Sequence, residues 1–149
     1  MPEKATVERA RQAKRAGKSP TTQAGEFVRE EIHHVREGKH GARSAKQAIA
    51  IGLSKARRSG VKLPPPPASA TEGTKQSAKS ASRAAGRSRK TSSRRSRATR
   101  QALKREPKAA ASHQALARQA KSAARRRPAS ARKASARKAA RTRVRRPKS

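Results

Sequence analysis

Apolar residues recur at regular intervals in the first 62 residues of the chain and become sparse after them. In residues 1–62 they lie three to four positions apart, which is the spacing of one face of an α-helix. The pattern predicts three helices, over about 6–16, 20–37 and 45–58. We therefore expect residues 1–62 to form a small all-α module.

Residues that favour helix ends lie at the borders of the second and third helices. Ser19 precedes Pro20, so the serine can cap the helix while the proline occupies its first turn. Gly38 can adopt the left-handed conformation that ends a helix. Ser44 and Gln47 have the spacing of a capping box, in which each side chain accepts from or donates to the backbone of the other.

The second and third helices each carry one apolar stripe, and the stripes predict a helical hairpin. We expect Leu53 to be buried in it, and we expect Glu31 to interrupt the stripe of the second helix. A module with so few large side chains is marginal alone, so it could be completed by forming a homo-oligomer. The stripe positions are Ala24, Val28, Ile32 and Val35 on one helix and Ala45, Ile49, Gly52, Leu53 and Ala56 on the other.

The remainder of the chain lacks the large apolar residues that a core needs. Leu, Ile, Val and Phe number 13 in 149 residues, and a highly charged chain below roughly 20% of these residues is expected to be disordered. The prolines of residues 63–67 predict a semi-rigid linker. We therefore predict that residues 68–149, rich in Ala, Ser, Lys and Arg, form a long disordered basic tail that is only partly helical.

Charge is the strongest indication of function. The formal net charge is +34, and such an excess of cations favours polyanionic partners. In the module, the third helix and the loop before it carry the basic residues, whereas the second helix carries four glutamates. The predicted nucleic-acid contacts in the module are Lys39, Arg43, Lys46, Lys55, Arg57 and Arg58.

Basic residues in the tail are spread around the chain rather than gathered on one side. The segment ASARK occurs at 129–133 and again at 134–138, and a five-residue step turns a helix by about 140°. This distribution suits contact with phosphates and not the reading of bases. The predicted contacts in the tail are Arg125, Arg126, Arg127, Arg132, Lys133, Arg137 and Lys138.

No pattern in the sequence indicates an enzyme, a cofactor or a metal centre. The chain has neither Cys nor Asp, and it contains no phosphate-binding loop with the usual spacing. His33 and His34 point about 100° apart on a helix, and the zinc-protease order H-E-x-x-H is absent. We interpret the segment EEIHHVREGKH as a solvated, ion-paired helix face.

The block TQAGEFVREEIHHVREGKHGARSAKQAIAIGLSKARRSGVKLPPP resembles an uncharacterised family of small basic bacterial proteins. The resemblance covers residues 1–67 and implies a bacterial source, but it implies no activity. The tail resembles the Lys- and Ala-rich tails of histone-H1-like DNA-packaging proteins.

These patterns predict a protein that binds double-stranded DNA largely without sequence preference, in the cytoplasm and associated with the nucleoid. Single-strand and many RNA-binding surfaces stack bases on aromatic residues, and the chain has only Phe27. A ribosome- or RNA-associated protein is the alternative. A polycation on a membrane surface is a further one, although stable insertion is not expected because no apolar run reaches the length of a membrane span.

Overall fold

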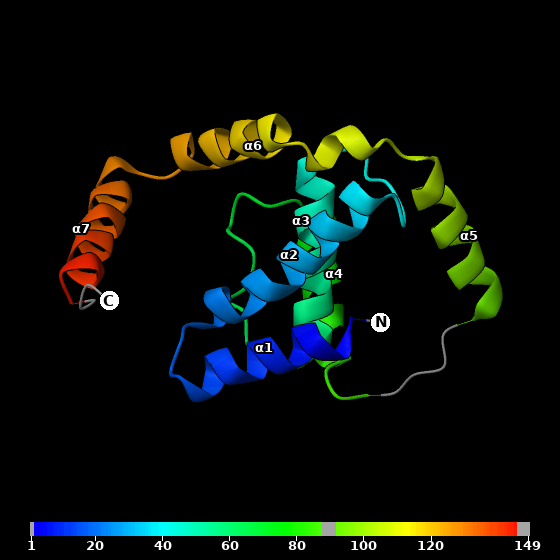
Figure 1. Ribbon diagram of the computed structural model, residues 1–149, viewed down its shortest axis with the longest axis horizontal. Coiled ribbons are helices and arrows are strands. Elements are labelled where there is room, and N and C mark those ends of the chain that lie inside the picture. Colours follow the sequence, from blue (N-terminus) through cyan, green and yellow to red (C-terminus); the bar gives the residue numbers. More distant parts are fainter. Residues whose placement is uncertain (1, 88–91, 146–149) are drawn as a thin grey trace.

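The computed structural model describes residues 2–87 and 92–145, and these residues form an all-α structure (Figure 1). The first three helices are α1 (Lys4–Arg15), α2 (Pro20–Glu37) and α3 (Ala45–Arg58). The later helices are α4 (Glu72–Arg83), α5 (Ser93–Arg105), the short 3₁₀ helix η1 (Lys108–Ala111), α6 (His113–Arg125) and α7 (Ala129–Arg145).

The helix ends follow from local sequence. Ser19 Oγ accepts from the Thr22 N–H, and Gly38 ends α2 with a φ of 78°. Ser44 Oγ accepts from the Gln47 N–H at 3.2 Å, as the capping pattern predicts. The Gln47 side chain reaches back one residue further than expected, where its Oε1 accepts from the Arg43 N–H at 2.7 Å.

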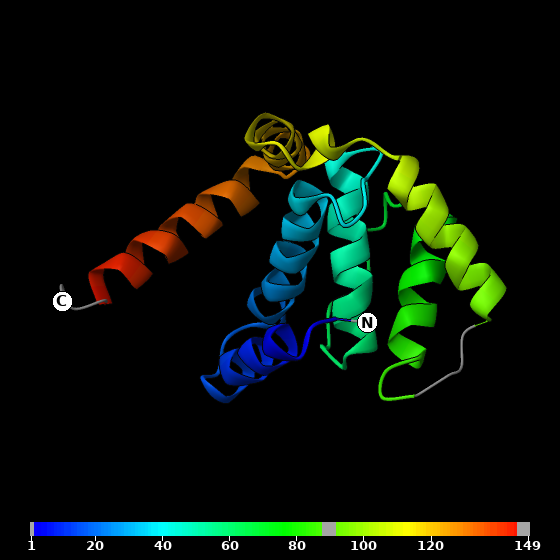
Figure 2. The same ribbon diagram turned by 45° about the vertical axis from the view of Figure 1, so that its right-hand side comes forward.

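Helix α2 lies between α1 and α3, and α4 packs on the other side of α3 (Figures 1 and 2). The close approach of α2 and α3 depends on Gly52, because a Cβ atom there would lie 2.7 Å from Val28 Cα. One apolar cluster has Phe27, fully buried, at its centre. Leu53 and Ile49 are half-buried at most, so the expected burial of these two large side chains is only partial.

A second apolar cluster joins the module to residues far along the chain. Val35, Ala42 and Ala48 pack with Ala110 and Ala111 of η1. Two backbone hydrogen bonds hold the same region, because the N–H groups of Gly41 and Ala42 donate to the carbonyl oxygens of Leu103 and Pro107 at 2.8 and 3.1 Å. The connection from α5 to η1 is therefore docked on the loop between α2 and α3.

The prediction of a long disordered tail is wrong for the described residues. Helices α4 to α7 occupy most of the predicted tail. The error came from counting only large apolar residues, whereas alanine has the highest intrinsic helix propensity and here also fills the packed contacts. Thr71, Ser92 and Ser112 cap three of these helices. Residues 88–91 and 146–149 of the predicted tail lie outside the described residues.

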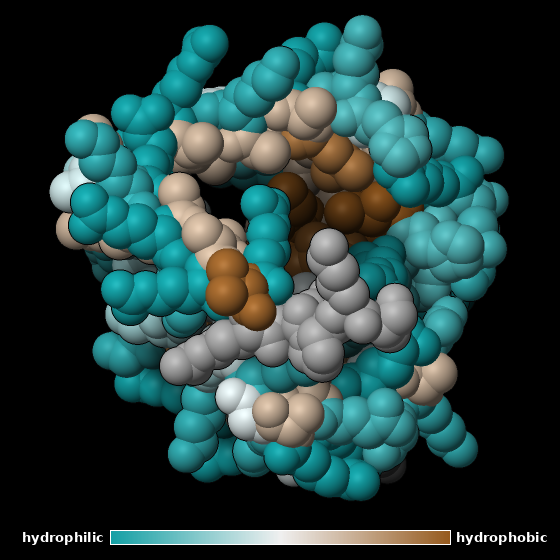
Figure 3. Space-filling model, turned by 60° about the vertical axis from the view of Figure 1, so that its left-hand side comes forward, coloured by the Kyte–Doolittle hydropathy of each residue, from teal (hydrophilic) through white to brown (hydrophobic). Residues whose placement is uncertain are grey.

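Helices α5 and α7 extend to opposite sides of the packed helices (Figures 1 and 2). No residue of α5 is buried, and polar side chains cover most of the face drawn in Figure 3, around one recess lined by apolar ones. The only large apolar side chain that is fully exposed among the described residues is Val144, at 86%. None of the described helices is both long enough and apolar enough to cross a bilayer.

Replacing Gly41 with alanine tests the docked connection. A Cβ atom at position 41 would collide with the backbone carbonyl of Glu106, so we expect Gly41→Ala to lower the melting temperature and to speed amide exchange at Ala42. Gly25→Ala is the matched control, because Gly25 lies in α2 with open space around it. That change should stabilise by up to about 1 kcal/mol, and equal behaviour of the two variants would contradict the docking.

Candidate nucleic-acid interface

A basic groove lies between the start of α3, η1 and α6. Its volume is about 460 Å³. Three cationic side chains line it: Arg43 from the loop before α3, Lys46 from the first turn of α3 and Arg118 from α6. The remaining lining residues are small or polar: Ser44, Ala45, Pro107, Ala109, Ala110, Ala115, Gln119 and Ser122.

Local structure places the groove at the positive end of a helix. The first N–H groups of a helix have no carbonyl partner within it, and the helix dipole adds partial positive charge there. The contacts of Gln47 with Arg43 and Ser44 fix the first turn of α3. On the opposite wall, Arg118, Gln119 and Ser122 share one face of α6. The groove therefore combines exposed cations with a helix N-terminus, which is a suitable surface for phosphate.

Every acidic residue of the chain is paired within the protein. The sequence has eight, and each lies within ion-pair distance of a Lys, Arg or His. Within the described part of the chain beyond residue 67, the ion pairs are Lys75 with Glu72 and Glu106 with Arg43. The other described cations of α4 to α7, up to Arg143, have no acidic partner there, and they are exposed.

The predicted contacts of the module divide into free and engaged cations. Lys46 and Arg58 are exposed, and Arg43 is 80% exposed with a single long contact of 3.8 Å to Glu106. The Arg57 guanidinium donates to the Pro64 carbonyl oxygen at 3.1 Å. These four residues remain candidates for phosphate contact.

Lys39 and Lys55 both form ion pairs with glutamates of the same chain. Lys39 lies 3.1 Å from Glu37 and 3.5 Å from Glu3, and hydrogen bonding to Glu37 is the main reason that its pKa is raised. Lys55 is 22% exposed and lies 2.6 Å from the buried carboxylate of Glu31. Lys55 is therefore a partner of buried acids in this structure rather than an open surface cation.

The structure leaves the predicted tail contacts at solvent-facing positions of α6, α7 and the turn between them. They are Arg125, Arg126, Arg127, Arg132, Lys133, Arg137 and Lys138. Arg127 also donates to the Ala131 carbonyl oxygen and to Ser135. The groove cations and the α7 cations do not form one patch, since α7 extends away from the packed helices (Figure 1).

Sequence reasoning missed two groups of cations. Arg118 is one, because nothing in the sequence near it indicates that α6 lies against the start of α3. The other is a stripe on α5, where Arg97, Arg100 and Lys104 recur at helical spacing and are exposed. The spacing of that stripe was a usable signal, which the expectation of disorder concealed.

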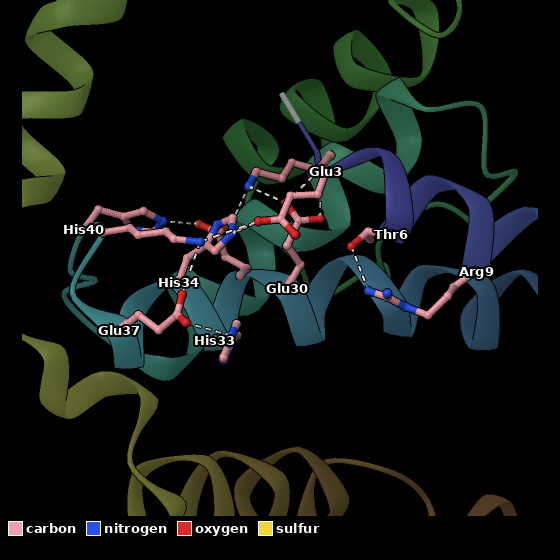
Figure 4. Close-up of polar contacts among 11 residues, drawn as sticks. Glu3, Thr6, Arg9, Glu30, His33, His34, Glu37 and His40 are labelled. Carbon is pink, nitrogen blue, oxygen red and sulfur yellow. Dashed lines mark hydrogen bonds and ion pairs between the residues drawn. The ribbon is translucent and has the colours of Figure 1, made fainter.

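A second cluster of polar side chains lies beside α2 (Figure 4). Glu30 and Glu31 are almost fully buried, and Lys55 contacts both. His40 lies 3.0 Å from Glu31, and His34 donates to Glu3 at 2.9 Å. That hydrogen bond is the main reason that the pKa of Glu3 is lowered. Glu31, which was expected to interrupt an apolar stripe, is thus the centre of a buried ionic cluster.

The segment EEIHHVREGKH only partly fits the interpretation as a solvated face. His33 is 65% exposed and pairs with Glu37 at 2.9 Å, which agrees with it. His34 and His40 are only 12% and 15% exposed and approach Glu31. The connection after Gly38 turns back toward α2, and sequence spacing alone does not reveal that return.

Comparison with known proteins adds one finding. Residues 11–66 match the model of a family of unknown function (DUF6496), in keeping with the resemblance to an uncharacterised family. The match covers α2, α3 and the last five residues of α1, and it leaves α4 to α7 outside. The chain matches no curated protein and no solved structure.

Proposed function

We propose that this protein binds double-stranded DNA through phosphate contacts, largely without sequence preference and without catalysis. The observation that carries the proposal is the pairing of all eight acids inside the protein. The protein therefore has no spare carboxylate to offset its charge excess of +34, and most of the cations that the structure describes are exposed. A protein that neutralises phosphates with such cations gains affinity by releasing counterions.

The burial of Phe27 supports a duplex over a single strand as the partner. Single-strand binders stack bases on exposed aromatic side chains. Phe27 is the only Phe, and the chain has no Tyr or Trp. Because Phe27 is fully buried, it offers no surface to a base. Without base stacking, the available mode of binding is contact between cations on the helices and phosphates. This mode suits the regular backbone of a duplex.

The first turn of α3 supports binding without base readout. A reading helix would place the side chains of Lys46 and Gln47 against base edges. The Gln47 side chain is bound to the Arg43 backbone, and Lys46 lines a groove whose other wall is α6. Both residues are therefore better placed to hold a phosphate than to enter a DNA groove.

Cations on several sides of the molecule favour a packaging role associated with the nucleoid. Helices α5 and α7 extend to opposite sides of the packed helices (Figure 2), and the groove is lined by residues of α3, η1 and α6. One molecule could therefore contact two duplex segments and hold them together. This arrangement fits a histone-H1-like role in which cations carried by helices contact the DNA. A membrane-surface role fits poorly, because interfacial helices need an apolar face and the exposed faces of the described helices are polar.

Binding measured across a salt series tests this function. We expect duplex DNA to bind tightly at low salt, with the logarithm of affinity falling steeply as the logarithm of salt rises. The variant Arg43→Ala/Lys46→Ala/Arg118→Ala removes the three groove cations. It should reduce the slope by up to about 2.7, since each phosphate contact contributes about 0.9.

The control removes the same charge elsewhere, in Arg11→Ala/Lys14→Ala/Lys18→Ala. These residues are exposed on α1 and the turn after it, and we expect them to change the slope less. Equal losses in both variants would contradict the groove as the site. Preference for structured RNA over duplex at equal salt would favour the ribosome-associated alternative, and no duplex binding at low salt would refute the proposal.

A further inference from the structure

Three potential metal ligands converge beside α2. They are a carboxylate oxygen of Glu31 and one ring nitrogen each of His34 and His40, and all three atoms lie within 4.8 Å of one another. Glu31 and His34 are three residues apart on α2, a spacing that places a carboxylate and an imidazole on the same side of a helix. His40 reaches the same point from the loop that follows α2.

The hydrogen bonds of His40 point to a cation between it and Glu31. Its Nδ1 lies 3.0 Å from the Gly41 carbonyl oxygen, which can only accept, so Nδ1 carries a proton. In a neutral imidazole Nε2 then holds a lone pair, and this Nε2 lies 3.0 Å from Glu31 Oε1. Two lone pairs that face each other repel unless a cation lies between them.

The surroundings of Glu31 also favour a bound cation. Its side chain is 1% exposed, and Lys55 Nζ lies 2.6 Å from Oε2. Oε2 accepts no hydrogen bond in the structure, so its contact with Lys55 is an ion pair alone. Glu30, also buried, shares the same lysine at 3.6 Å. Two buried carboxylates thus have one permanent cation between them, and a second cation would lower the cost of burying them.

We propose that Glu31, His34 and His40 bind a Zn²⁺ ion. A proton shared by Glu31 and His40 would leave His34 bonded to Glu3 alone, whereas a metal ion would join all three converging groups. Two imidazole nitrogens and one carboxylate oxygen suit Zn²⁺ and its first-row neighbours, and not Ca²⁺ or Mg²⁺, which prefer oxygen ligands alone. The hydrogen bond from His40 Nδ1 to a backbone carbonyl is the support that metal-binding histidines usually have.

Lys55 and Glu3 complete the surroundings of the ion. Lys55 lies beside Oε2 of Glu31, so Oε1, which faces His40, is the oxygen that would bind the metal. The Glu3 carboxylate, 2.9 Å from His34 Nε2, brings a further oxygen to the edge of the site (Figure 4). With three ligands from the protein, the fourth position of a tetrahedral ion is open to this carboxylate or to water.

The position of the site gives the ion a structural consequence. His40 directly precedes Gly41 and Ala42, whose N–H groups hold the α5–η1 connection. An ion that joins His40 to α2 restrains this loop, and with it the docking of the later helices. Zn²⁺ should therefore raise the melting temperature of the full-length protein.

Calorimetric titration of the untagged, metal-free, full-length protein with ZnCl₂ tests the site. We expect one Zn²⁺ per chain, no comparable binding of Ca²⁺ or Mg²⁺, and affinity about 100-fold or more lower in His40→Ala. His33→Ala is the matched control, since His33 pairs with Glu37 at the surface, and its affinity should be unchanged. Absence of Zn²⁺ binding, or equal losses in both variants, would overturn the proposal.

A second measurement needs no variant and so does not depend on folding of His40→Ala. Nitrogen NMR of the imidazole rings should show Zn²⁺ shifting the signals of His34 and His40 while those of His33 and His113 stay in place. Shifts confined to His33 or His113 would refute the site. Either outcome leaves the duplex-binding proposal untouched, because the groove cations are not metal ligands.

Discussion

Replacing Phe27 with alanine is expected to lower the free energy of unfolding by about 3–5 kcal/mol. Phe27 is fully buried and packs with Ala10, Ala24 and Ala56. Partly buried Val7, Leu53, Val61 and Leu63 pack against the same cluster, and the surroundings of a deleted core side chain usually relax only partially into its cavity. Since large apolar side chains are few, this loss removes a large share of the core.

Chemical denaturation of the full-length protein measures the effect. Val144→Ala is the control, because Val144 is 86% exposed and surface changes usually alter stability by less than about 0.5 kcal/mol. The net charge is the same in both variants. Equal stability of the two would show that Phe27 is not the centre of the core.

Replacing Lys55 with methionine is expected to destabilise the metal-free protein by about 3 kcal/mol. Removing one partner of a buried ion pair costs about 3–5 kcal/mol, because the other charge stays buried without compensation. We place the effect at the lower end, since Lys55 is 22% exposed. Lys46→Met, at an exposed position without an acidic partner, should change stability by less than about 0.5 kcal/mol.

A double variant separates the stability lost through the unpaired charge from the stability lost through changed packing. Glu31→Gln added to Lys55→Met removes the charge that would be left unpaired, so part of the stability should return. Chemical denaturation in the presence of a chelator measures the free energy of unfolding of each variant. If Lys55→Met proves as stable as Lys46→Met, Lys55 is not a partner of the buried acids, and its interpretation as a phosphate contact becomes the better one.

The sequence predicted α2 and α3 well because their ends depend on nearby residues. Ser19, Gly38 and Ser44 act on backbone groups within a few positions of themselves, so their effect is local. The interior was predicted less well. Phe27 is not among the predicted stripe positions of α2, yet it is the largest fully buried side chain among the described residues. The side chains that face a helix depend on where its neighbours lie, which local periodicity does not specify.

The error about the tail has a specific physical cause. Alanine contributes little apolar area, so a count of large side chains treats an alanine-rich segment as unable to pack. Ala110 and Ala111 nevertheless complete a cluster with Val35, because small side chains let backbones approach closely enough for Gly41 and Ala42 to form hydrogen bonds with residues 103 and 107. These contacts join positions about 65 residues apart, which no local pattern could indicate.

The features of the candidate site likewise fall into those that the sequence determined and those that only the tertiary structure determined. The sequence by itself determined the charge excess, the helix ends and the lack of aromatic surface, because composition and local capping depend on no distant contact. Only the tertiary structure decided which cations are free. It placed Lys55 among buried acids, brought Arg118 beside Lys46, and gathered Glu31, His34 and His40 at one point. Pairing and convergence depend on distances across the fold, and those distances arise only when the helices pack.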